Sequence, residues 1–282
     1  MYTTGDKKHL VDTPPAAAAA LNTWIIDKAF YMPQLHRSRR IWLYLPPDYY
    51  TSKDSYPVIY MQDGQNLFEE WSAFGEEWGV DETLNAMNGK CIVVGIDNAG
   101  TRRMNEYALH DHERYGKGEG AQYLSFLVET LKPYIDQTYR TLPTREHTYI
   151  AGSSLGALIS YYACLYYPEV FGGAGIFSPA FWIAPDLAQD AGSKANGHYK
   201  QRFYFYYGEE EGAEMVDHVQ PIVKLLEAHP QYDVTTVVKN EGTHSESEWR
   251  QQFPWFYKWM MNKGKKKQPV QTGLTTNSKT SL

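Results

Sequence analysis

The segment TYIAGSSLGALISYY, residues Thr148–Tyr162, contains the pattern Gly-x-Ser-x-Gly at Gly152–Gly156. A strand-like run precedes the pattern and an apolar helical run follows it. This context is typical of a nucleophile elbow, a sharp strand-to-helix turn that presents the central hydroxyl. We therefore predict that Ser154 is a nucleophile and that Ser153 is structural. The alternative is a turn rich in glycine and serine that carries no chemistry.

A serine hydroxyl is a weak nucleophile and needs a base. His244, in EGTHSESEW, is the one histidine that follows the last strand-like run. In folds built around such an elbow, the chain order is serine, then acid, then histidine. The order predicts His244 as the general base, and a helix-capping or surface histidine is the alternative.

The acid should follow the preceding strand, and QRFYFYYGEEEG offers Glu209, Glu210 and Glu211 there. A carboxylate that accepts the imidazole N–H fixes the tautomer of the base and stabilises the imidazolium. The residues alone do not choose among the three glutamates. A solvated acidic turn is the other interpretation of this segment.

An acyl-transfer site also needs hydrogen-bond donors for the oxyanion. The backbone N–H that follows the nucleophile belongs to Leu155. A second donor is expected from the loop after the third strand, which reads YMQDGQNLF. We predict the backbone N–H of Gln65 for this role, because Gly64 allows a close approach.

Elements that could position these residues alternate along the chain. Alternation of strands and helices predicts a doubly wound, mostly parallel sheet. The first two strands are close in sequence and should pair antiparallel. The expected strands lie in 23–31, 39–49, 56–64, 91–100, 147–154, 172–182, 201–212 and 232–242, and the expected helices span 80–87, 120–139, 155–167, 215–229 and 246–262.

We expect a single domain over residues 23–262, an N-terminal extension over 1–22 and a basic, disordered tail over 263–282. The net charge of the chain is −6, and the tail carries five lysines without an acid. The body is therefore more acidic than the whole chain, which argues against nucleic acid as a partner. The sequence contains no apolar run of the length needed to span a membrane.

Both cysteines, Cys91 and Cys164, lie in apolar runs and are expected to be buried. No disulfide framework is implied, so we expect a cytoplasmic protein. A secreted or periplasmic location is the alternative if a signal peptide has been removed. The sequence does not decide between a monomer and a homodimer.

Seven segments together resemble the Putative esterase family of the α/β-hydrolases. This family includes enterochelin esterases, feruloyl and acetyl-xylan esterases, and S-formylglutathione hydrolase. The resemblance covers residues 23–262 and implies an α/β-hydrolase fold with an eight-stranded, mostly parallel sheet and helices on both faces. The segments are RRIWLYLPPDYY, YPVIYMQDGQNLF, GIDNAGTRRMNEY, YLSFLVETLKPYIDQTYRT, AGSSLGALISYYACLYYPEVFGGAGIFSPAFW, YGEEEG and EGTHSESEWRQQFP.

The resemblance also implies roles for single residues. Family members often carry Gly-x-x-Glu after the seventh strand, which selects Glu211. Some enterochelin-type relatives work with a Ser-His pair alone, which is the alternative to a triad with Glu211. Phe181 and Trp182, after the sixth strand, are implied to wall the substrate pocket, and ordinary packing is the alternative.

Two further clusters follow the fourth strand. Arg103, with Glu106 and Tyr107, is predicted either to hold substrate or to form a structural ion pair. The run HDHE at 110–113 contains metal-ligand types, but without other clustered ligands we expect no metal there.

We interpret the sequence as a serine carboxylesterase that needs no cofactor and acts on a small-molecule or carbohydrate ester. Feruloyl or other aryl esters, acetylated sugars and siderophore esters all remain candidates. One alternative is an acyltransferase with the same triad. Another is a catalytically silent binding module with a hydrolase fold.

Overall fold

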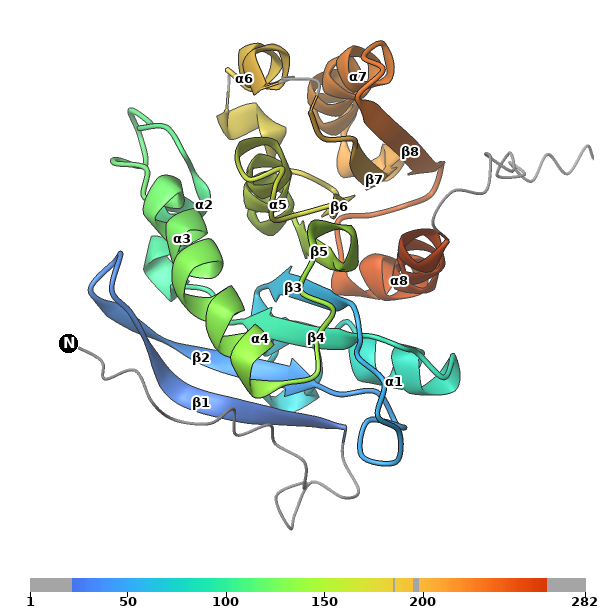
Figure 1. Ribbon diagram of the computed structural model, residues 1–282. Coiled ribbons are helices and arrows are strands. Elements are labelled where there is room, and N and C mark those ends of the chain that lie inside the picture. The colour runs from blue at the N-terminus through green and yellow to red at the C-terminus, as the bar shows by residue number, and fades with distance from the viewer. Residues whose placement is uncertain (1–21, 185, 195–197, 263–282) are drawn as a thin grey trace, which may run out of the picture.

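The computed structural model describes residues 22–184, 186–194 and 198–262 (Figure 1). The predicted basic tail, and all of the predicted N-terminal extension except residue 22, lie outside these described residues. The described part forms two layers of helices around one central sheet.

The sheet has eight strands in the order β1-β2-β4-β3-β5-β6-β7-β8. β1 pairs antiparallel with β2, and β2 pairs antiparallel with β4, whereas all other neighbours are parallel. The expected eight-stranded, mostly parallel sheet is confirmed. The strands are β1 (Thr23–Met32), β2 (Arg37–Tyr44), β3 (Val58–Gln62), β4 (Ile92–Ile96), β5 (Thr148–Ser153), β6 (Gly173–Phe177), β7 (Gln201–Gly208) and β8 (Tyr232–Lys239).

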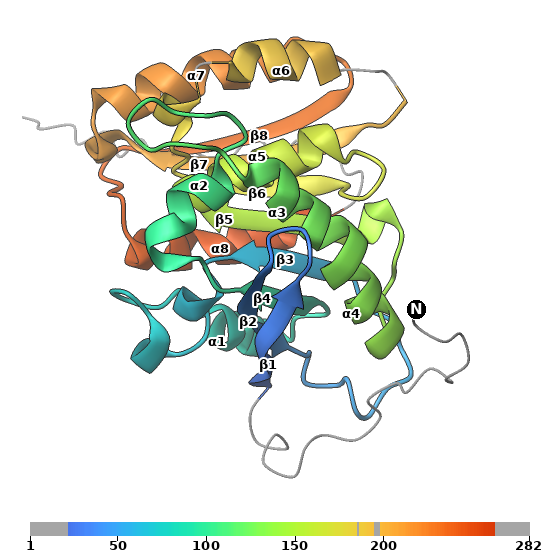
Figure 2. The same cartoon turned by 90° about the vertical axis from the view of Figure 1, so that its left-hand side faces the viewer.

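Every residue of the four central strands β3, β4, β5 and β6 is buried. Continuous apolar strands of this kind require cover on both faces of the sheet. Figure 2 shows the helices that give this cover. They are α1 (Val80–Ala86), α2 (Arg103–Tyr107), α3 (Gly120–Phe126), α4 (Lys132–Thr138), α5 (Leu155–Tyr166), α6 (Leu187–Lys194), α7 (Ala213–Glu227) and α8 (Glu246–Met261).

The two faces have separate apolar cores. Buried side chains of α2 to α7 pack on one face, and those of α1 and α8 pack on the other. α5 is buried along almost its whole length, because it lies between the sheet and the helices beside it. Short 3₁₀ turns complete the fold at Gly64–Asn66, Glu70–Ser72, Gly100–Arg102, Arg145–His147, Phe181–Ile183 and Glu209–Glu211.

The second strand-like run ends early, and one predicted helix needs correction. β2 ends at Tyr44, because Pro46 and Pro47, within the same run, have no N–H to donate to a ladder. The helix expected over 120–139 is divided by a π-helical turn, Leu127–Leu131, into α3 and α4. Pro133, in the first turn of α4, cannot donate the hydrogen bond that a continuous α-helix needs there.

Two helices were not expected. α2 has only five residues, and a segment this short shows no clear periodicity. α6 buries few side chains, because most of LAQDAGSK is polar or small.

Candidate active site

Ser154 lies at the turn between β5 and α5 with φ 56° and ψ −121°. A positive φ is unusual for a residue with a side chain and marks local strain. A Cβ atom on Gly152 would lie 2.7 Å from the carbonyl carbon of Gly156, and one on Gly156 would lie 2.9 Å from Asp63 Oδ2. The tight turn therefore needs both glycines of the Gly-x-Ser-x-Gly pattern.

The carboxylate of Glu211 contacts the imidazole of His244. Glu211 Oε2 lies 2.7 Å from His244 Nδ1, and the glutamate side chain is fully enclosed. Its other oxygen, Oε1, accepts hydrogen bonds from the backbone N–H of Gly208 and from Ser178 Oγ, each at 2.7 Å. The neighbouring glutamates, 209 and 210, are both exposed. Of the three candidate acids, Glu211 thus faces the histidine.

The loops that carry this acid and this base touch through two glycines. The N–H of Glu210 donates to the carbonyl of Gly242 at 3.1 Å. A Cβ atom on Gly208 would lie 2.6 Å from Gly242 Cα, so no side chain fits there. We call this backbone contact between Gly208 and Gly242 the glycine seam. It fixes the end of β7 against the loop that leads from β8 to His244.

Trp249 and Ser178 complete the surroundings of the acid–base pair. The indole ring lies edge-to-face on the imidazole of His244, with ring centroids 5.0 Å apart and an interplanar angle of 86°. Its Nε1–H donates to Ser178 Oγ at 2.9 Å. Sequence reasoning missed Ser178, although its position between the end of β6 and Pro179 is a signal for a turn at the sheet edge.

The predicted oxyanion donors lie at the starts of two helical turns. Leu155 is the first residue of α5, and Gln65 lies in the 3₁₀ turn Gly64–Asn66. N–H groups at a helix start have no partner within the helix and are available to other acceptors. The Gln65 side chain is held by the N–H of Asn98, which donates to Oε1 at 3.1 Å. Gly64 is needed because a Cβ there would lie 2.7 Å from Ile96 N.

Arg103 forms an ion pair with Asp63, beside the elbow that carries Ser154. Its Nε and Nη2 donate to the two carboxylate oxygens at 2.6 and 2.8 Å, and Nη2 also lies 3.4 Å from the carbonyl of Ser153. Burial works to lower the pKa of Arg103, but the Asp63 carboxylate outweighs it and holds the pKa above its ordinary value. Arg103 therefore links the segment after β3 to the elbow.

Glu106 is not the partner of Arg103. It is completely buried and accepts hydrogen bonds from Arg37 and Arg39 of β2. Of the two roles considered for this segment, Glu106 has the structural one.

Ser154 and His244 open into one cleft of about 900 Å³ at the carboxyl edge of the sheet. Its wall combines polar side chains with the apolar side chains of Ala73, Phe74 and Trp249. Phe74 is 94% exposed, and its N–H donates to Asn66 Oδ1 at 3.0 Å. The lining residues are Arg40, Asp63, Gln65, Asn66, Ser72, Ala73, Phe74, Asp97, Asn98, Gly100, Arg103, Ser153, Ser154, His244, Glu246 and Trp249.

The two aromatic residues expected to wall the pocket follow Ala180, whose N–H donates to the carbonyl of Ser154 at 3.1 Å. Phe181 is 2% exposed and packs on Tyr161, with ring centroids 5.1 Å apart. Trp182 is 47% exposed and lies edge-to-face on Tyr115. Neither lines the cleft of Ser154, so their contact with substrate stays a prediction, and only Trp182 has an exposed ring to offer.

The remaining sequence candidates have structural contacts. His110 Nε2 lies 3.3 Å from Asp190 Oδ2, and His112 lies beside the Tyr115 ring. Within the described ranges, no three His, Cys, Asp or Glu side chains group as a metal site would require. Both cysteines are buried thiols, as predicted. Every helix of the described part is too short or too polar to cross a bilayer.

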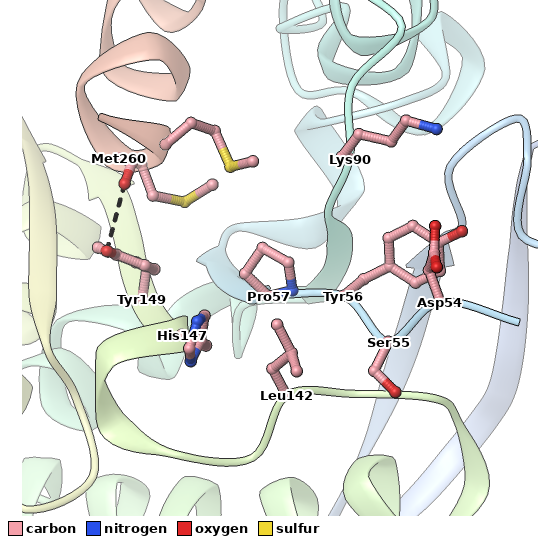
Figure 3. A pocket seen from close by; sticks show the side chains of 10 residues that line it. Asp54, Ser55, Tyr56, Pro57, Lys90, Leu142, His147, Tyr149 and Met260 are labelled. Carbon is pink, nitrogen blue, oxygen red and sulfur yellow. Dashed lines mark hydrogen bonds between the residues drawn. The ribbon is translucent and has the colours of Figure 1, made fainter. Parts of the chain in front are cut away.

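A second cavity, of about 500 Å³, lies at the opposite edge of the sheet (Figure 3). Tyr56 and Pro57 precede β3, and His147 precedes β5, so the cavity lies at the amino ends of these strands. Tyr149 donates its hydroxyl hydrogen bond to the carbonyl of Met260 across it at 3.3 Å. The cavity shares no lining residue with the cleft of Ser154.

Comparison with known proteins gives a family match over most of the chain. The profile of the family described as Putative esterase matches residues 33–260. The Bacillus subtilis protein YbbA is 30% identical over 183 residues, which cover 63% of this chain and 70% of YbbA. The iron(III) salmochelin esterase of Escherichia coli is 28% identical over 189 residues, which cover 62% of this chain but only 42% of that protein. A second Bacillus subtilis relative, YjcH, is matched over 64% of its length.

Solved structures share the fold. The BES protein from Bacillus cereus superposes with a TM-score of 0.69 at 17% identity, covering 92% of this chain and 99% of that one. The enterobactin esterase Fes from Shigella flexneri gives a TM-score of 0.68 at 19% identity, covering 90% of this chain and 62% of that one. At these identities the likeness establishes the arrangement of the elements.

Proposed function

Because the chain belongs to the Putative esterase family and is therefore a carboxylic ester hydrolase, we propose that Ser154, His244 and Glu211 perform the hydrolysis as a catalytic triad. The observation that carries this proposal is the 2.7 Å contact between Glu211 Oε2 and His244 Nδ1. Ser154 and His244 line the same cleft, and Ser154 occupies the strained apex of the elbow.

In the proposed mechanism, Ser154 Oγ attacks the ester carbonyl carbon while His244 Nε2 takes the hydroxyl proton. The tetrahedral intermediate collapses to an acyl-enzyme, and His244 gives the proton to the departing alkoxide, which leaves as an alcohol. Water then attacks the acyl carbonyl, with His244 again as base, and releases the acid and free Ser154. Glu211 holds the imidazole and stabilises its charged form throughout.

We assign the oxyanion donors to the backbone N–H groups of Leu155 and Gln65. Leu155 begins α5 and Gln65 is the second residue of the 3₁₀ turn Gly64–Asn66, positions where backbone N–H groups are free to donate. The ion pair between Arg103 and Asp63 supports this arrangement, because it ties the segment that carries Gln65 to the carbonyl of Ser153.

The charged and amide side chains in the wall of the cleft favour hydrolysis over acyl transfer to an alcohol. A transferase must keep water from its acyl-enzyme, which calls for an apolar acceptor groove. Here arginine, aspartate, asparagine and glutamine side chains make up much of the wall. Water is thus expected to reach the acyl-enzyme readily.

For the substrate, we propose a small ester that carries an aromatic ring. Phe74 offers an exposed ring in the cleft, and the guanidinium of Arg40 lies over the rings of Trp42 and Trp71, 4.9 and 5.8 Å from their centroids. Aromatic side chains of this kind stack favourably on flat ligands. Relatives with matching chemistry are the salmochelin esterase and a structure described as a ferulic acid esterase.

Labelling and a substrate panel test the proposal. A fluorophosphonate probe should label wild-type protein and leave Ser154→Ala unlabelled, and an unlabelled wild type would support the silent binding module instead. The panel compares p-nitrophenyl acetate, methyl ferulate, a catecholate triester and acetylated xylan. Preference for acetylated xylan would contradict the aryl substrate but not the triad.

Phe74→Ala refines the substrate test. It should raise KM for the aryl esters about tenfold, the scale of one lost aromatic contact, and leave hydrolysis of acetylated xylan, which has no aromatic ring, little changed. Trp255→Ala is the matched control, since this ring is 59% exposed on α8 and does not line the cleft. Equal effects of the two variants would rule out a specific role for Phe74.

A further inference from the structure

We propose that Trp249 is a positioning residue that acts through Ser178 to set the direction of the hydrogen-bond chain ending at His244. The proposal rests on the proposed function, because it concerns how the triad base is kept in its reactive form. It goes beyond the triad by adding two residues, one from α8 and one from the end of β6.

The direction of the chain follows from donor chemistry. An indole nitrogen can only donate a hydrogen bond, so the hydroxyl of Ser178 must accept from Trp249 Nε1, 2.9 Å away. The hydroxyl then has its own proton free to donate. The acceptor within reach is Glu211 Oε1, at 2.7 Å from Ser178 Oγ.

The carboxylate of Glu211 is therefore held in one orientation by two donors. Ser178 Oγ and the backbone N–H of Gly208 both donate to Oε1, which leaves Oε2 for the imidazole. Donors to a carboxylate favour its charged form, and a charged carboxylate only accepts hydrogen bonds. His244 must then carry its proton on Nδ1, which leaves Nε2 with the lone pair that a general base needs.

Trp249 is held rigidly, so it can fix the direction of this hydrogen-bond chain. Its ring is 4% exposed and packs on Trp78, with ring centroids 5.6 Å apart, while its edge-to-face contact holds the imidazole plane of His244. Ser178 is fixed too, because its backbone has φ 46° and its N–H donates to the carbonyl of Tyr206 at 2.7 Å. The hydroxyl therefore stands between two rigid partners.

Ser178→Ala removes the donor, and Trp249→Phe keeps an aromatic ring against His244 but removes the N–H. We expect each variant to lower kcat by about tenfold, the scale of one hydrogen bond to a charged group. The double variant should be no worse than Ser178→Ala, because the tryptophan acts through the serine. Ser178→Gly is a second form of the test that also suits the positive φ.

The pH profile of kcat/KM separates positioning from packing. Without the serine donor, or without the indole N–H that directs it to Glu211, the charge of Glu211 is less dispersed and holds the imidazolium more strongly. The acidic limb should therefore move to higher pH in both single variants. The other charged groups of the cleft, Arg40, Asp63, Asp97, Arg103 and Glu246, are the same in every variant.

Trp78→Phe is the matched control, because it trims the same aromatic cluster without touching the chain. It should lower Tm but leave the pH profile in place. Proton NMR gives a readout without substrate, since the Nδ1–H resonance between His244 and Glu211 should lie far downfield in wild type and shift in Ser178→Ala.

The proposal is overturned if all the variants lose Tm alike and keep the wild-type pH profile and Nδ1–H resonance. Trp249 and Ser178 would then contribute packing alone. The proposal would also be overturned if the losses in kcat of the two single variants added up in the double variant. Failure of the proposed function appears differently, as wild-type protein that the fluorophosphonate does not label or as an active Ser154→Ala variant.

Discussion

Glu211 Oε2 and His244 Nδ1 lie 2.7 Å apart although 33 positions separate the two residues in the chain. The contact joins the turn after β7 to the loop after β8, two strands that pair in parallel along their whole length. The glycine seam between Gly208 and Gly242 brings the two loops together at the backbone level. Ser154, at the apex of the elbow, lines the same cleft as His244.

Ser154→Ala should remove nearly all turnover and leave the fold intact, because the hydroxyl forms the covalent intermediate. Loss of a triad nucleophile costs about 10⁶-fold in kcat in a well-studied protease. Ser153→Ala is the control and should cost far less, since Ser153 is a buried residue at the end of β5. Steady-state kinetics on one activated ester measures kcat for both variants. If Ser153→Ala lost more activity than Ser154→Ala, the assignment of Ser154 as the nucleophile would be wrong.

His244→Ala should reduce kcat nearly as much as Ser154→Ala, because the hydroxyl is not activated without its base. The double variant should be little worse than either single one, since residues that act as a unit are not additive. A clearly active His244→Ala enzyme would mean that the base lies elsewhere. His110→Ala serves as the control, because this histidine contacts Asp190 and does not line the cleft.

Glu211→Gln should lower kcat strongly, whereas Glu209→Gln and Glu210→Gln should have mild effects. An amide can favour the wrong imidazole tautomer and supplies no charge, a change that costs about 10⁴-fold in a serine protease. The partial exposure of His244, at 41% of its side chain, is expected to make the loss smaller here. Equal and small losses in all three variants would favour a Ser154–His244 pair without an acid.

Gly208→Ala should lower kcat together with Tm, because the new methyl group would force the acid and base loops apart at the glycine seam. Overpacking of this kind costs about 1–3 kcal/mol of unfolding free energy. Gly192→Ala is the control, since a Cβ there meets no atom within 4 Å and Gly192 lies in α6. It should raise stability by about 0.5–1 kcal/mol, the usual gain for alanine in a helix. Full activity in Gly208→Ala would show that the two loops tolerate separation.

Asp81 makes stability depend on pH. Burial, together with the neighbouring Glu82, raises the pKa of Asp81 to about 8 in the folded protein, and its Oδ1 atom is buried without a partner. Between its unfolded pKa near 4 and this value, the folded state binds more protons than the unfolded state. The free energy of unfolding contributed by this group therefore falls as pH rises through that window.

Asp81→Asn should remove this dependence and make the protein more stable than wild type at pH 8.5, with little difference at pH 4. Urea unfolding at several pH values measures the effect. Asp217→Asn, on the exposed side of α7, is the control and should follow the wild-type curve. If the free energy of unfolding of Asp81→Asn changed with pH in parallel with that of wild type, the burial argument would be contradicted.

The parts of the site that the sequence predicted depend on local patterns. The Gly-x-Ser-x-Gly pattern, with a strand before it and a helix after it, correctly predicts the tight turn at Ser154, because the steric need for glycine acts within five residues. The strands were found for a similar reason, since buried parallel strands are apolar without a break.

The parts of the site that the sequence did not predict depend on contacts between segments far apart in the chain. Residue types alone left three glutamates open, because they differ only in where the 3₁₀ turn Glu209–Glu211 points them. Ser178 and Trp249 meet across 71 positions, and Arg103 finds Asp63 across 40. The sequence placed Arg103 near the site but could not choose its partner, since Glu106 lies nearer in the chain and faces β2 instead.

Three residues with side chains hold positive φ angles at the ends of neighbouring strands: Asp63 at 55°, Ser154 at 56° and Ser178 at 46°. Glycine would relieve strain at each, so selection for heat tolerance alone should favour glycine there. The same change would delete the ion pair with Arg103, the proposed nucleophile or the donor to Glu211. The carboxyl edge of this sheet is thus where thermostability and turnover compete, and stabilising substitutions are better sought elsewhere in the fold.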